Sequence, residues 1–212
     1  MALFDNIPTS TKDFEAILQC IENFSRISDS RFENEFFSTI KTFVYHRPTI
    51  LQYENKLSDK SYFVAKGFVF AFFYDGNQEI VAFRIFTKGE VALIPDSFMN
   101  LRIAGCSLMV CSDSRLLEIT HADALYLYET FPEIVMVTVQ MLAEMNMKDV
   151  DRDKMLSLGK KGAIARFYEL YPELYGNTTH QFRDMYIARY LHMNPVTFSR
   201  LRRELFPNYP DE

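Results

Sequence analysis

Residues 183–205 read RDMYIARYLHMNPVTFSRLRREL, and this stretch decides how the end of the chain folds. Ile187 and Leu191 give a first helix an apolar face, and the small Ala188 suits a close helix crossing. Residues 192–194 then make a short turn, after which Asn194 can cap a second helix and Pro195 fits its first position. The stretch therefore predicts a helix, a tight turn and a helix.

The second helix of this unit has two different faces. Phe198, Leu201 and Leu205 follow three- and four-residue spacing and are expected to pack inward. At about 100° per residue, Val196 and Arg200 lie roughly on the opposite face. The exposed face includes Val196, Ser199, Arg200 and Arg203. We also count Arg202 among the arginines of this face.

The exposed face has the residue types that a helix uses in the major groove of DNA. Arginine bonds guanine, an apolar side chain meets the thymine methyl group, and hydroxyls or further arginines bind phosphates. We therefore predict that Val196 and Arg200 read bases, and that Thr197, Ser199 and Arg203 contact the DNA backbone. An ordinary amphipathic helix with a solvated basic face is the alternative interpretation.

Upstream, residues 132–158 predict one long helix that begins at Pro132. Ile134, Val137, Met141 and Met145 share a face, with Val135 and Leu142 beside them. That face either packs on a sheet or forms a dimer seam. Because the charged residues 148–154 offer few core contacts, we place a domain junction there, between 1–150 and 151–212, followed by a helix at about 160–171.

The middle of the chain, residues 42–119, has the pattern of short strands. Runs rich in Phe, Val, Ile and Tyr are broken at glycines 67, 76, 89 and 105, where hairpins need positive φ. Residues 68–74 and 79–87 make the clearest hairpin. The pattern predicts a β-sandwich or β-roll between an N-terminal helix at 10–24 and a short helix at 122–129. The fold class is therefore α+β.

Composition narrows the class of protein. The chain has 212 residues, 48% of them hydrophobic, which is typical of a folded protein. The net charge is −5, divided into +2 from Asp153 onward and −7 before it. No apolar run is long enough to cross a bilayer, so we expect a cytoplasmic protein without membrane contact. Cys20, Cys106 and Cys111 form no CxxC pair and are expected to be free buried thiols, with no metal site.

These features together resemble the Crp/Fnr-type bacterial regulators. Their divergent members often read Ile-Ala-x-x-Leu-Gly and then Ser-Arg-x-Arg, which matches residues 187–192 and 199–202 here. Residues 62–69 resemble a strand pair of the cyclic-nucleotide-binding β-roll. The resemblance covers most of the chain. It implies an N-terminal double-stranded β-helix, jelly-roll-like and flanked by helices, then a long dimer helix and a C-terminal winged helix-turn-helix.

The sequence departs from this family at two places. His192 stands where the family has Gly in the turn, a position that strains any other residue if it is left-handed. The phosphate cassette of the nucleotide binders is absent, because Leu93-Ile94 and Ala104-Gly105 replace its Gly-Glu and Arg-Ser. We therefore expect no cyclic-nucleotide cofactor. The iron–sulfur sensors of the family use clustered N-terminal cysteines, and Cys20 stands alone there, so we expect no cluster either. Glu90 and Arg102 remain candidates for a rearranged effector site.

The resemblance implies a homodimeric, sequence-specific transcription regulator that binds double-stranded DNA and is modulated by an unknown small effector. RNA polymerase is the further partner that it implies. A ligand-binding or protein-interaction module without DNA binding is the alternative, although a degenerate copy would be expected to lose arginines 200, 202 and 203. We do not expect the protein to be an enzyme, because its four histidines are scattered along the chain. His121 and Asp123 are more simply explained as the start of a helix than as a catalytic pair.

Overall fold

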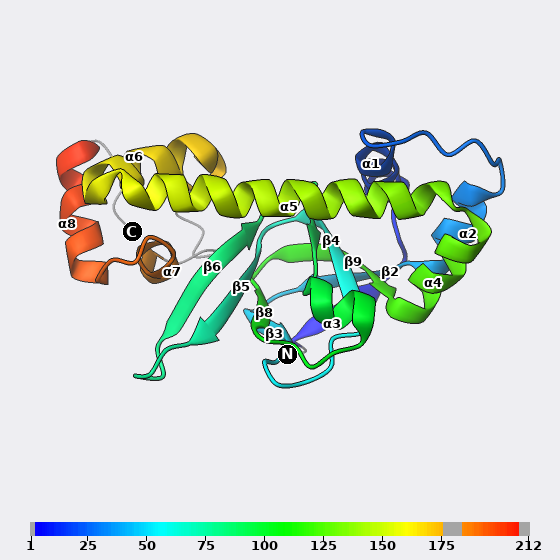
Figure 1. Cartoon of the computed structure of the whole chain (residues 1–212), viewed down its shortest axis with the longest axis horizontal. Helices are drawn as coiled ribbons and strands as arrows, with labels where there is room; N and C mark the ends of the chain where they lie inside the picture. Colours follow the sequence, from blue (N-terminus) through cyan, green and yellow to red (C-terminus); the bar gives the residue numbers. More distant parts are fainter. Residues whose placement is uncertain (1–2, 176–183, 208–212) are drawn as a thin grey trace.

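The computed structural model describes residues 3–175 and 184–207, which form a β-roll, a long helix and a helical C-terminal region (Figure 1). The strands are β1 Phe4–Ile7, β2 Lys41–Tyr45, β3 Thr49–Gln52, β4 Lys60–Lys66, β5 Val69–Tyr74, β6 Ile80–Phe86, β7 Val91–Ala92, β8 Ser107–Val110 and β9 Ser114–Thr120. The helices are α1 Thr11–Glu22, α2 Phe32–Thr39, α3 Pro95–Asn100, α4 His121–Thr130, α5 Glu133–Ser157, α6 Gly159–Leu170, η1 Pro172–Leu174, α7 Asp184–Tyr190 and α8 Pro195–Leu205.

The β-roll consists of two antiparallel sheets. Sheet A has the strand order β1-β2-β9-β4-β7, and sheet B has the order β3-β8-β5-β6. Alternate side chains point between the sheets, among them Val64, Val69, Leu108 and Leu116, which are fully buried. This two-sheet roll with flanking helices confirms the predicted α+β class and the jelly-roll-like N-terminal region.

The outer face of sheet A is covered by helices. Phe63 and Leu117 point out of the roll and pack with Ile17 and Ile21 of α1 and with Val137 of α5. Ser10 caps α1 by accepting a hydrogen bond from the Asp13 backbone N–H at 3.2 Å. The sequence allowed this face of α5 either to pack on a sheet or to form a dimer seam, and in the structure it packs on the sheet.

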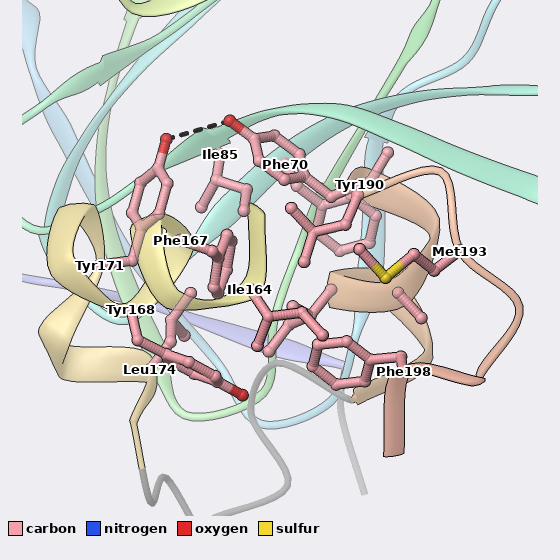
Figure 2. Packing of buried hydrophobic residues seen from close by; sticks show 14 of the residues in the cluster. Phe70, Ile85, Ile164, Phe167, Tyr168, Tyr171, Leu174, Tyr190, Met193 and Phe198 are labelled. Carbon is pink, nitrogen blue, oxygen red and sulfur yellow. Dashed lines mark hydrogen bonds between the residues drawn. The ribbon is translucent and has the colours of Figure 1, made fainter. Parts of the chain in front are cut away.

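The outer face of sheet B is covered by the C-terminal helices. Phe70 and Phe72 of β5 alternate with Val69 and Ala71, so one side of the strand packs into the roll and the other packs against α6, α7 and α8. Figure 2 shows Phe70 and Ile85 of the hairpin beside Ile164, Phe167 and Tyr190 of these helices. We call this cluster the shared core, because both halves of the chain contribute to it.

Helix α5 runs without interruption through the charged residues 148–154. Asp149 accepts a hydrogen bond of 3.0 Å from Arg84 Nε of β6, and Arg152 donates one of 3.0 Å to the Tyr190 carbonyl of α7. Met155, 1% exposed, belongs to the shared core. The charged stretch expected to mark a junction is therefore where α5 binds both the β-hairpin and the C-terminal helices.

Three further expectations are corrected or restricted by the structure. The β5–β6 turn places Gln78 rather than Gly76 at positive φ, because Asp75 Oδ1 accepts the Asn77 and Glu79 N–H groups at 2.8 and 3.0 Å. Residues 159–175 and 184–207 contain helices and no strand, so the strands of the expected wing are not found in them. Arg183, the expected start of α7, lies outside the described residues.

The helix starting at His121 confirms the reading of His121 and Asp123 as a helix start. Thr120 Oγ1 accepts a hydrogen bond from the Asp123 N–H at 3.1 Å and lies 2.6 Å from the Asp123 carboxylate.

In the part of the chain that the structure describes, no helix is both long and apolar enough to cross a membrane.

The shared core predicts that Phe70→Ala destabilises the C-terminal helices as well as the sheet. Phe70 is fully buried and its ring centroid lies 4.7 Å from that of Tyr186 in α7. We expect the free energy of unfolding to fall by about 3–5 kcal/mol in urea titrations, and amide-exchange protection in α7 to fall with it. Tyr53→Ala, at a 59% exposed site, is the control. Unchanged protection of α7 would contradict a shared core.

Candidate nucleic-acid interface

The turn between α7 and α8 is built by local hydrogen bonds. The Met193 N–H donates to the Ala188 carbonyl at 2.8 Å, which ends α7. Asn194 caps α8 by accepting a hydrogen bond from the Val196 N–H at 2.9 Å, and Pro195 occupies the first helical position. The predicted helix, tight turn and helix are all present.

His192 takes the left-handed conformation that the sequence analysis anticipated for a glycine position, with φ of 53°. Its Nε2 lies 3.0 Å from an Arg152 guanidinium nitrogen, which also bonds the Tyr190 carbonyl. Because the guanidinium can only donate, Nε2 accepts and the imidazole is neutral. Burial, and then the positive charge of Arg152, lower the pKa of His192.

The two faces of α8 are as predicted. Phe198 is fully buried and Leu201 is 7% exposed, whereas Val196 is 77% exposed. Arg200 and Arg203 are exposed as well. Four of the five predicted DNA-contacting residues, together with three neighbours, line one shallow surface groove, whose lining is Asp184, Pro195, Val196, Ser199, Arg200, Arg203 and Glu204. Thr197 is half-buried and is not among the residues of this groove.

Arg202, which the sequence analysis counted with the exposed arginines, is instead buried at 4% exposure. Its guanidinium lies 2.5 Å from the Asp184 carboxylate of α7 and 5.4 Å from the centroid of the Phe198 ring. Helical spacing places residue 202 beside Phe198, so this arginine joins α8 to α7. The basic face of α8 therefore consists of Arg200 and Arg203.

Glu204 and Lys161 complete the surface around Arg200. Glu204 accepts hydrogen bonds from Arg200 at 3.1 Å and from Lys161 of α6 at 2.9 Å. The Lys161 ammonium, and then Arg200, hold the pKa of the Glu204 carboxyl below its ordinary value. Sequence reasoning missed Lys161 because only the fold brings α6 to this surface, whereas the four-residue spacing of Arg200 and Glu204 was a readable signal.

The candidate effector residues Glu90 and Arg102 are not brought together. Glu90 forms an ion pair with Lys148 of α5 and accepts a hydrogen bond from the Thr87 N–H at 3.1 Å. The Arg102 side chain is 70% exposed and lies 3.4 Å from Asp96. Among the described residues, no group of three or more His, Cys, Asp or Glu side chains could hold a metal ion.

A second exposed surface lies on α5, opposite its packed face. Its apolar members follow three- and four-residue steps and are largely exposed; they are Met136, Val139, Ala143, Met147 and Val150. Met147 is 68% exposed and Val139 is 53% exposed. We call these five residues the α5 stripe. Exposed contiguous apolar surfaces of this kind are common at protein–protein contact sites.

Comparison with solved structures gives a consistent fold. The c-di-GMP-responsive regulator CLP of Xanthomonas campestris matches 85% of this chain and 93% of its own, with a TM-score of 0.66 and 16% identity. A cyclic nucleotide-binding domain protein of Listeria monocytogenes matches 92% and 91%, with a TM-score of 0.62 and 16% identity. The catabolite activator protein of Thermus thermophilus matches 85% and 84%, with a TM-score of 0.50 and 20% identity.

No family model matches the sequence. No curated protein matches it either. The chain nevertheless has the fold of the Crp/Fnr-type regulators and of cyclic-nucleotide-binding proteins, which confirms the resemblance at the level of fold.

The His192 geometry predicts a pH dependence of stability. Because the pKa of His192 is lowered from 6.5 in the folded protein, the unfolded chain takes up this proton first as the pH falls. The contribution of neutral His192 to the free energy of unfolding is complete above pH 6.5. It decreases as the pH drops through 6.5 and is lost below the lowered pKa of His192 in the folded protein. His192→Asn also tolerates positive φ but cannot titrate.

The measurement is urea unfolding at several pH values between 5 and 7.5. We expect His192→Asn to lose less stability than the parent protein over this range. Parallel pH profiles for the two proteins would show that the pKa of His192 is not lowered in the folded protein.

Proposed function

We propose that this protein is a sequence-specific transcription regulator that binds double-stranded DNA as a homodimer and acts in the cytoplasm. The observation that carries the proposal is α8, whose buried face is fixed by Phe198 and Arg202 while Val196, Arg200 and Arg203 face outward. A surface helix with this composition suits insertion in the major groove. The fold shared with Crp/Fnr-type regulators supports the same function.

Each of the five predicted DNA-contacting residues has a proposed role. Arg200 would bond guanine and Val196 would contact a thymine methyl group, while Thr197, Ser199 and Arg203 would hold the phosphates. The Arg200–Glu204 pair is exposed, and exposed ion pairs contribute little stability. Arg200 can therefore exchange Glu204 for a base, while Lys161 still neutralises Glu204.

The α5 stripe supports the homodimer. If two copies pair through this stripe with their α5 helices parallel, the two α8 helices lie at the same end of the assembly. Half-sites about one helical turn apart, roughly 34 Å, would then be recognised. We propose a small effector and RNA polymerase as further partners, and we assign the protein no catalytic role.

Arg200→Ala is expected to relax base choice, because it removes a bidentate contact worth about 1–3 kcal/mol. The measurement is selection of bound sequences from a random duplex pool, followed by titration of selected and random DNA. Arg203→Ala should weaken both kinds of DNA similarly and reduce the salt dependence by about one phosphate contact. Arg31→Ala, at an exposed site far along the chain, is the control.

Equal losses on selected and random DNA for Arg200→Ala would contradict its base-reading role. If the parent protein enriches no sequence, two explanations remain: DNA binding requires the effector, or the protein is a ligand-binding or protein-interaction module without DNA binding.

Val139→Glu is expected to convert a dimer to a monomer, since it places a charge in the middle of the α5 stripe where it would have to be desolvated. Sedimentation velocity at micromolar concentration measures the change. Tyr53→Glu introduces the same side chain at a 59% exposed site outside α5 and should leave the dimer intact. A dimer unaffected by Val139→Glu would place the interface elsewhere.

A further inference from the structure

A cavity of about 220 Å³ lies between α5, α1 and the β-roll. Much of its wall belongs to the cluster outside sheet A, where Ile21, Phe63, Leu117 and Val137 are buried. The wall continues past β7 to Phe86 of β6 in sheet B, which belongs to the cluster between the two sheets. The cavity thus follows the packed face of α5 rather than the interior of the roll alone.

The size of the cavity sets the size of its ligand. A dry cavity of about 150 Å³ lined by Leu, Ile and Phe accommodates benzene, which has six heavy atoms. In proportion, 220 Å³ suits a molecule of about nine heavy atoms. The apolar walls favour a ligand that is itself apolar over most of its surface.

The charged groups at one end of the cavity do not favour an anion. Lys148 and Arg84 both line it, and each is already paired with a carboxylate, Glu90 and Asp149 respectively. A ligand carboxylate or phosphate would have to displace one of these partners. Cys20 also lines the cavity, and burial, followed by the charges of Glu144 and Glu90, raises the pKa of its thiol to about 11. Burial, and then these two carboxylates, therefore disfavour a negative charge beside Cys20.

Besides the carboxylates of Glu90 and Glu144, the other polar groups that line the cavity are neutral hydroxyls. Thr138 and Ser61 line the cavity, and Thr138 Oγ1 lies 3.2 Å from the Tyr128 hydroxyl, which lines it as well. Hydroxyl groups can donate to or accept from one polar atom of a neutral ligand. They offer orientation without requiring a charge.

We propose that this cavity binds an uncharged, largely apolar small molecule of about nine heavy atoms that carries at most one hydroxyl, carbonyl or N–H group. Binding itself does not depend on DNA recognition. Only its regulatory consequence rests on the function proposed above. That consequence follows from β6, because Ile85 lines the cavity and also belongs to the shared core with α6 and α7.

Indole is a suitable probe, since it is neutral, has nine heavy atoms and fluoresces, and the chain contains no Trp to interfere. We expect saturable binding to the full-length protein at one site per chain, with a blue shift of the indole emission. Benzyl alcohol should displace indole at least tenfold more effectively than benzoate, a charged molecule of nearly the same size.

Val137→Phe fills the cavity and should weaken indole binding at least tenfold. Gln140→Phe adds the same ring at an exposed position of α5 and should not. Cys20→Phe, which fills the cavity from α1, replaces Val137→Phe if circular dichroism shows that the latter fails to fold.

Three results would overturn the proposal: no saturable binding, equal binding by the parent and the cavity-filled variant, or displacement by benzoate as effective as by benzyl alcohol. DNA selection tests the proposed function separately. A protein that binds indole but enriches no DNA would retain this site and lose only its regulatory meaning.

Discussion

The two-sided burial of the β5–β6 hairpin is the constraint on which the rest of the structure depends. A strand with both faces covered needs apolar residues at successive positions, and β5 has them from Val69 to Phe72, all at 2% exposure or less. One face closes the roll and the other supports α6, α7 and α8. Strand β6 is the partner of β5 in this hairpin. Arg84 of β6 pairs with Asp149 of α5, and Glu79 of the hairpin turn pairs with Arg189 of α7.

Helix α5 extends this constraint along the molecule. Its 25 residues correspond to a length of about 37 Å, and Ile134, Met145 and Met155 contribute to three different buried clusters. A helix fixed at three points cannot rotate at one end without disturbing the packing at the other. The exposed residues of α5 are therefore held at a constant angle to the exposed face of α8.

Local chemistry made much of the fold and of the candidate site predictable. Caps such as Ser10 and Asn194, Pro195 at a helix start, and the spacing of Phe198 and Leu201 depend on neighbouring residues only. The outward face of α8 follows from the same periodicity. Long-range packing was not predictable from these signals. Neither the strand order of the two sheets nor the position of Lys161 beside Glu204 is encoded by spacing along the chain.

The charged residues show most clearly where sequence reasoning stopped. Residues 148–154 resemble a linker in composition, yet Arg152 makes two hydrogen bonds to the region of the turn between α7 and α8. Arg202 resembles a solvated arginine, yet its stem and guanidinium lie between α7 and α8. Long charged side chains can cover apolar surface and reach distant partners, so their role depends on what the fold places nearby.

The shared core also limits how this chain could have changed over evolutionary time. A helix-turn-helix with a closed core of its own can be exchanged between unrelated sensor domains as an independent module. Here Phe167, Tyr186 and Tyr190 pack against the sheet, so transfer to another protein would leave an aromatic surface open to solvent unless those positions were replaced together. The β-roll and the helix-turn-helix are thus expected to be inherited as a pair.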